Sequence, residues 1–168
     1  VRLLLAHPGI DVNQRDNYSQ RTPLLAAIDD GNVACVRLLL RHVDIDVNKA
    51  CPLGISPLHA AVAAGNAECV QLLLAHRAGV LVNQTDDHRR TPLYIAMATK
   101  NVCEKCVRLI LAHPDVDVSQ ADSEGVSPLC VAANHGRDAL LALLLAHPSV
   151  QVNQVDGEGI TALYAACN

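Results

Sequence analysis

Two cysteines three residues apart, Cys103 and Cys106, have the spacing of a thiol–disulfide exchange site. At the start of a helix, such a C-x-x-C pair can stabilise a reactive thiolate. The surrounding sequence, however, lacks the βαβ pattern that accompanies redox-active pairs. Cys106 also shares its register with Cys35 and Cys69, on the apolar face of a predicted helix. The pair is therefore interpreted as structural, with thiols that act as small buried apolar groups.

A second candidate for chemistry is a set of histidines that recurs along the chain. These residues are His7, His42, His76, His113 and His147. Regular spacing places them in a row, whereas zinc needs three or four ligands at about 2.1 Å from one point. Each is expected at a helix C-terminus, where an imidazole can hydrogen-bond the last carbonyl groups. The sequence therefore predicts no metal site.

No other pattern indicates catalysis, and the composition excludes several classes of protein. The chain has no Ser-His-Asp order, no glycine-rich phosphate loop and no paired carboxylates suited to a pocket, so neither enzyme activity nor a cofactor is predicted. A net charge of -4 argues against binding to nucleic acid. The longest apolar run, residues 139–146, is far shorter than the roughly 20 residues of a membrane span. An odd number of cysteines, 7, favours reduced thiols and an intracellular, cytoplasmic protein.

The elements that must position any site form an internal repeat. A Thr/Ser-Pro-Leu tripeptide or a near variant begins at Thr22, Ser56, Thr91, Ser127 and Thr161. A Leu-rich ladder, the His ladder and an Asn ladder run beside it in the same register. The chain contains no Trp or Phe. Stacked thin layers of Leu and Ala would supply the core volume that large rings usually provide.

Each repeat is predicted to contain two short helices. Thr22 can accept a hydrogen bond as N-cap, and Pro23 suits the first helical position, so a helix is expected through about Asp30. Gly31 then ends it, and a second helix is expected over about residues 32–42. A turn-rich loop leads to the next unit. Such pairs cannot bury both faces alone, so they must stack on their neighbours.

These features resemble the ankyrin repeat family over essentially the whole chain. The family motif Thr-Pro-Leu-His-x-Ala-Ala is closest at residues 56–61, and residues 65–74 are similar to the family's second helix. Its Asp-x-x-Gly turn is present at residues 122–125 and 156–159. The resemblance implies an all-α, helix-turn-helix solenoid with hairpin-like finger loops.

The repeats divide the chain into one solenoid of about four and a half units. The predicted divisions are a partial repeat 1–21, repeats 22–55, 56–90, 91–126 and 127–160, and a partial repeat 161–168. Both ends are apolar, whereas terminal repeats normally carry polar caps, so flanking repeats are expected in the full-length protein.

Three departures from the family pattern make finger or loop conformations uncertain from sequence. Cys51 replaces the turn Asp of one repeat, and Arg89 replaces the turn Gly of another, where a positive φ would be costly. Two extra residues lie between the helices of the third complete repeat, around residues 100–105.

The resemblance implies that a protein or extended peptide binds along a concave strip formed by the fingers and the exposed sides of the first helices. The predicted contact residues are Tyr18, Arg21, Asp29, Asp30, Leu53, Ile55, His88, Arg90, Glu124, Val126, Asn134, His135 and Glu158. The strip is acidic at Asp29 and Asp30, apolar around Ile55 and basic at Arg90, which could bind a partner's carboxylate. Tyr94 and Tyr164 align with the inward position of His59, which leaves Tyr18 as the exposed aromatic anchor.

The sequence therefore predicts a non-catalytic scaffold for protein–protein interaction. The alternative is a targeting or positioning arm of a larger enzyme, channel or effector whose active domain lies outside this segment.

Overall fold

The computed structural model describes residues 1–100 and 103–167, and this part of the chain consists of short α-helices joined by loops. Within it no strand forms; one isolated bridge joins Val155 and Thr161. Residues 101–102, inside the predicted extra segment, and residue 168 lie outside the described residues. The helices are α1 (Arg2–Leu5), α2 (Pro23–Asp29), α3 (Val33–Leu39), α4 (Pro57–Ala63), α5 (Ala67–Leu74), α6 (Pro92–Ala98), α7 (Glu104–Leu111), α8 (Pro128–Asn134), α9 (Asp138–Leu145) and α10 (Ala162–Ala166).

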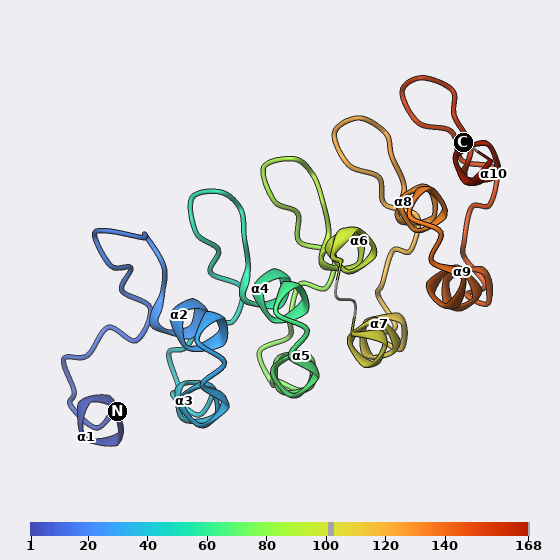
Figure 1. Cartoon of the computed structure of the whole chain (residues 1–168). Helices are drawn as coiled ribbons and strands as arrows, with labels where there is room; N and C mark the ends of the chain where they lie inside the picture. Colours follow the sequence, from blue (N-terminus) through green and yellow to red (C-terminus); the bar gives the residue numbers. More distant parts are fainter. Residues whose placement is uncertain (101–102, 168) are drawn as a thin grey trace.

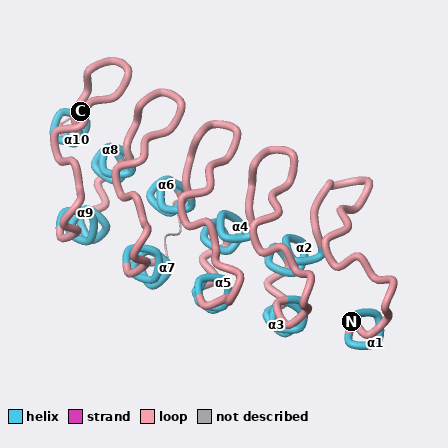
Figure 2. The backbone as a smooth tube through the Cα atoms, turned by 180° about the vertical axis from the view of Figure 1, so that it is seen from behind, coloured by secondary structure: helices cyan, strands magenta, loops and turns pink. Residues whose placement is uncertain are grey.

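The helices are stacked in two parallel rows that follow the order of the repeats along the molecule (Figure 1). The first helices, α2, α4, α6, α8 and α10, form one row, and the second helices, α1, α3, α5, α7 and α9, form the other. From α2 onward, each helix packs on the next member of its own row. Loops rise from the row of first helices and lie side by side in both views (Figures 1 and 2). We call their turns fingers 1 to 5: residues 16–21, 51–55, 86–90, 122–126 and 156–160. The all-α solenoid is thus confirmed.

Helix starts follow the predicted capping chemistry. The hydroxyl of Thr22 accepts a hydrogen bond from the backbone N–H of Leu25, and the equivalent Ser or Thr does the same in α4, α6, α8 and α10. Asn32 and Asn66 cap α3 and α5 in the same way. These side chains satisfy backbone donors that have no partner inside the helix.

The second helices end earlier than predicted, and the histidines beyond them have a different role. Helix α3 ends at Leu39, so His42 lies in the following turn. Its Nδ1 accepts a hydrogen bond from the N–H of Asp44 at 3.2 Å, and the four other histidines of the ladder accept one from the residue two positions on. The imidazole therefore closes a turn, whereas the sequence had indicated bonds to its own helix's carbonyls. Only His76 among them also donates to a carbonyl within the described residues, that of Leu40 in the preceding repeat.

The core is a continuous layer of medium-sized side chains between the two rows. Leu24, Val36, Leu58 and Leu73 are among its fully buried members, and the equivalent positions of later repeats are filled by residues of the same kind. Alanines such as Ala61, also fully buried, let the helices approach closely. Repetition of these layers explains how the chain forms a core without Trp or Phe.

The Asn ladder ties each repeat to the next. The Nδ2 of Asn48 donates to the carbonyl of Gly79 at 3.1 Å, and its Oδ1 accepts from the N–H of Leu81 at 2.9 Å. Asn13 and Asn83 bridge to the following repeat in the same two-bond manner. At the Ser119 position a single bond remains, from the N–H of Gln151. One amide side chain thus satisfies a donor and an acceptor of a neighbouring loop.

We expect Asn48→Ala to lower the free energy of unfolding by about 1–3 kcal/mol, because a backbone donor and acceptor lose their partner. Asn153→Ala is the matched control, since Asn153 holds the same local position but receives no hydrogen bond from the described residues. Urea denaturation followed by circular dichroism compares the two. Equal effects of both substitutions would show that the bridge does not stabilise the array.

Candidate functional site

Aspartates shape fingers 3 to 5. Oδ1 of Asp86 accepts hydrogen bonds from the N–H groups of His88 and Arg90 at 3.0 and 2.9 Å, and Asp122 and Asp156 bind their own fingers in the same way. Finger 2 has Cys51 in place of the aspartate and is closed by backbone bonds alone, from Cys51 N–H to the carbonyl of Ile55 at 3.0 Å. The substitution of Asp by Cys therefore leaves the turn in place.

Finger 3 keeps the same turn although Arg89 replaces glycine. Arg89 has a φ of 61°, in the left-handed region, and its N–H still bonds the carbonyl of Asp86 at 2.9 Å. Such a conformation costs a non-glycine residue on the order of 1 kcal/mol. The surrounding hydrogen bonds of Asp86 hold it, so the departure from the family pattern does not alter the finger.

Backbone hydrogen bonds join the tips of fingers 2 to 5. The N–H of Asp87 donates to the carbonyl of Leu53, that of Ser123 to His88, and that of Gly157 to Glu124, at 3.2, 2.9 and 2.8 Å. The packing is close, since a Cβ on Gly54 would lie 2.6 Å from Cα of Asp86. In finger 2 the donor position is Pro52, which has no N–H. Fingers 1 and 2 therefore lack this link.

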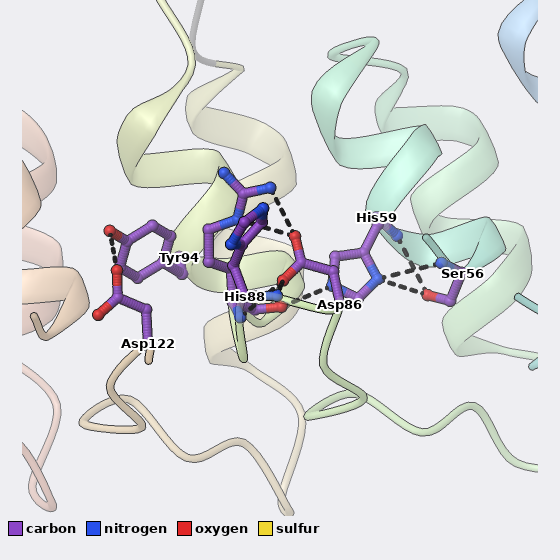
Figure 3. A network of polar contacts seen from close by, with 7 residues as sticks. Ser56, His59, Asp86, His88, Tyr94 and Asp122 are labelled. Carbon is purple, nitrogen blue, oxygen red and sulfur yellow. Dashed lines mark hydrogen bonds and ion pairs between the residues drawn. The ribbon is translucent and has the colours of Figure 1, made fainter. Parts of the chain in front are cut away.

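Beneath the fingers, polar side chains of the first helices bind the next finger (Figure 3). Nδ1 of His59 accepts from the N–H of Ser56, and its Nε2 donates to the carbonyl of Arg90 at 2.9 Å. Burial lowers the pKa of His59 and outweighs the opposing effect of the bond to Arg90. The hydroxyl of Tyr94 donates to Oδ2 of Asp122 at 2.7 Å, and its pKa is raised by burial and by that carboxylate. His59 and Tyr94, each in its neutral form, therefore connect a first helix to the next finger.

The predicted contact residues lie in one row along the fingers and first helices. Tyr18 is 100% exposed at the tip of finger 1, and Leu53 is 67% exposed at the tip of finger 2. Also exposed are Arg21, Asp29, Asp30, His88, Glu124, Asn134, His135 and Glu158. Ile55, Arg90 and Val126 are half-buried at the bases of their fingers.

A groove of about 550 Å³ lies between fingers 1 and 2 and the helices below them. We call it groove A. It brings together four of the predicted residues, Arg21, Asp29, Leu53 and Ile55. Its rim carries the ion pair of Arg21 with Asp29 at 2.8 Å, and its wall includes Ala60 and Ile95. Groove A thus joins an apolar surface to a charged edge.

A second groove, of about 360 Å³, crosses α8 between α6 and α10, and we call it groove B. Three predicted residues, Val126, Asn134 and His135, line it. Several other residues in its lining were not predicted from the sequence. They are Tyr94, Ala98, Cys130, Val131, Asp156, Ile160, Tyr164 and Ala165. The spacing of Cys130 and Asn134, four residues apart on one helix, is the signal that could have found part of this surface.

The structure modifies two predicted roles. Nε and one terminal nitrogen of Arg90 bind Oδ2 of Asp86 at 2.8 and 2.7 Å, so this edge of the guanidinium is already engaged within the chain. Burial would raise the pKa of Asp86, but the hydrogen bonds from Arg90 outweigh it and hold that pKa below its usual value. Tyr164 was expected to point inward like Tyr94 but is 59% exposed. The described residues after it contain no further finger to cover its ring.

The remaining candidates for chemistry lie apart from the grooves. Burial, together with a hydrogen bond from the thiol of Cys106 to Cys103, raises the pKa of Cys106 to about 12, which opposes a reactive thiolate. No group of three or more His, Cys, Asp or Glu side chains among residues 1–100 and 103–167 could hold a metal ion. In the same residues no helix has the length and apolar character that crossing a membrane requires.

Comparison with known families agrees with the fold. A family model described as Ankyrin repeats (3 copies) matches residues 43–122 and 97–168. A model of the single Ankyrin repeat matches residues 19–50. No curated protein matches the chain significantly.

We expect the stability of the protein to fall with pH below about 6.5, in part because of His59. The unfolded state binds a proton near pH 6.5, whereas the folded state, with its lowered pKa, stays neutral to more acidic pH. The contribution of His59 to stability is then complete above pH 6.5 and falls by about 1.4 kcal/mol per pH unit below it, until the folded pKa is reached.

The measurement is urea denaturation at pH 7.5 and 5.5, with His59→Gln as the variant. Glutamine can keep one acceptor and one donor but does not titrate. The variant should lose less stability than the native chain over this range. An identical pH dependence in both proteins would contradict the assignment.

Proposed function

The chain belongs to the ankyrin repeat family, and on that basis we propose that it binds an extended peptide segment of a protein partner along the concave strip. Ankyrin repeats are in general protein–protein interaction modules. The strip comprises the fingers, the exposed ends of the first helices, and grooves A and B. The proposal assigns no chemical step to the chain.

Groove A is the observation that supports this most directly. It is open to solvent, and its lining is mainly apolar, with Leu53, Ile55 and Ala60 among the contributors. Exposed apolar surface of this kind, bordered by charged groups, is typical of sites that bind another protein. The Arg21–Asp29 pair at the rim can offer both signs of charge to a partner.

The backbone of the strip is suited to present side chains at fixed positions. Backbone hydrogen bonds join fingers 2 to 5, aspartates shape fingers 3 to 5, and His59 and Tyr94 bind fingers 3 and 4 from below. Little ordering of the protein is therefore needed when a partner binds, which favours affinity. A row of shallow grooves also fits an extended chain better than a small molecule, which needs a deeper enclosure.

We expect Leu53→Asp to weaken binding of a strip-directed peptide at least tenfold, since it removes exposed apolar surface at groove A and adds a charge. Its exposure means that the substitution should leave folding intact. Peptides selected from a displayed random library against the native chain, then titrated by calorimetry, provide the measurement.

The matched control is Val43→Asp, because Val43 is 73% exposed in the loop after α3, outside both grooves. It should bind the selected peptides as the native chain does. Equal affinity of the native chain and Leu53→Asp for every selected peptide would overturn the strip as the binding site. Arg90 is unsuitable for this test, because its replacement would leave the carboxylate of Asp86, 1% exposed, without its partner.

A further inference from the structure

At every junction between repeats, the third residue of a first helix meets the position of the turn aspartate in the next finger. The four complete junctions pair Leu25 with Cys51, His59 with Asp86, Tyr94 with Asp122, and Cys130 with Asp156. At the second and third junctions a large polar side chain of the helix bonds the finger above. The first junction is apolar on both sides. The fourth is mismatched, since it combines a small thiol with a carboxylate.

The third junction shows what a matched pair does. The ring of Tyr94 fills the space under finger 4, and its hydroxyl donates to Oδ2 of Asp122 at 2.7 Å (Figure 3). Oδ1 of Asp122 is already used by two N–H groups of its own finger. The two carboxylate oxygens of Asp122 therefore have different roles. Oδ1 accepts hydrogen bonds from the finger backbone, and Oδ2 accepts the hydrogen bond of the phenol.

The fourth junction repeats the carboxylate without the phenol. Oδ1 of Asp156 accepts from the N–H groups of Glu158 and Ile160, both at 2.9 Å. No described residue donates to its Oδ2, and Cys130 is too short to reach across as Tyr94 does. Groove B lies at this place, and both Cys130 and Asp156 line it. The groove thus combines space for a ring with an acceptor that has no donor in the described chain.

The walls of groove B favour an aromatic ring over a simple cation. Val126, Val131, Ile160 and the ring of Tyr94 contribute apolar surface. A lysine ammonium is strongly hydrated and would lose water against these walls, whereas a phenol has an apolar body and one donor at its tip. The only acidic side chain in the lining is that of Asp156, where the hydroxyl would arrive.

We propose that groove B receives a tyrosine side chain of the partner peptide, whose hydroxyl donates to Oδ2 of Asp156. This inference rests on the proposed function, because it assigns one subsite of the strip. The partner supplies in trans the group that Tyr94 supplies within the chain one repeat earlier. Selectivity for tyrosine over phenylalanine then comes from a hydrogen bond to a carboxylate, which is worth roughly tenfold in affinity.

The direct test uses 4-methylphenol, the tyrosine side chain itself, as probe. Titration of the ¹⁵N-labelled chain should give saturable shifts of amides around groove B, including those of Asn134 and Ile160. The control probe is 4-methylanisole, which keeps the ring but has no O–H to donate, and it should bind roughly tenfold more weakly. Equal affinity for the two probes, or shifts spread over the whole chain, would overturn the inference.

Three variants locate the site. Cys130→Tyr should place the missing ring in the groove and abolish probe binding, whereas Cys130→Ala leaves the groove open and should retain it. Asp156→Asn keeps the Oδ1 acceptor that the finger needs but replaces the second acceptor by an amide donor. The variant should bind 4-methylphenol only as weakly as the native chain binds 4-methylanisole. Circular dichroism confirms folding of each variant, and undiminished binding by folded Asp156→Asn would contradict the proposal.

Displayed peptides separate this inference from the proposed function. Selection on the native chain should enrich tyrosine at one position, and replacing that tyrosine by phenylalanine should cost as much affinity as Asp156→Asn does. Peptides that depend on Leu53 but ignore Cys130→Tyr, or that enrich lysine or arginine instead, would overturn the groove B subsite and leave the strip standing. Probe binding without any peptide binding would overturn the strip instead.

Discussion

Each repeat depends on its neighbours, because a pair of helices with only two turns each cannot cover its own apolar faces. Leu24, Leu58 and Leu93 are almost fully buried, although each belongs to a different short helix, since the next repeat in the row lies over it. Stacking provides the hydrophobic stabilisation that a single helix pair lacks. The absence of Phe and Trp follows from the same constraint, because thin layers leave little space for large rings.

Stacking also creates backbone groups at each junction that must find partners. The chain meets this need with recurring side chains: an Asn or Ser119 in the lower loops, an Asp in most fingers, and His59 or Tyr94 between helix and finger at two of the four junctions. These hydrogen bonds are structural, yet they decide which polar side chains of the fingers stay unengaged at the surface. Arg90 shows this most clearly, since the buried carboxylate of Asp86 uses the guanidinium that the exposed strip seemed to offer.

Differences between repeats, rather than the repeated features, distinguish one part of the strip from another. Pro52 removes the backbone link between fingers 1 and 2, where groove A lies. Cys130 takes the place of a tyrosine at groove B. In both cases a residue that cannot complete an internal hydrogen bond stands beside an open surface. An array of nearly identical units can acquire local specificity in this manner.

The repeat, the helix starts at residues such as Thr22 and the row on which the predicted contact residues lie follow from the sequence alone, because capping and helical periodicity act within a few neighbouring residues. The sequence could not determine that the second helices end before His42, that Arg90 is bound by Asp86, or that Tyr164 is exposed. Nor could it place groove B between Cys130 and Asp156. Those outcomes depend on which side chains meet across a repeat junction and how much space they fill, and only the stacked structure decides both.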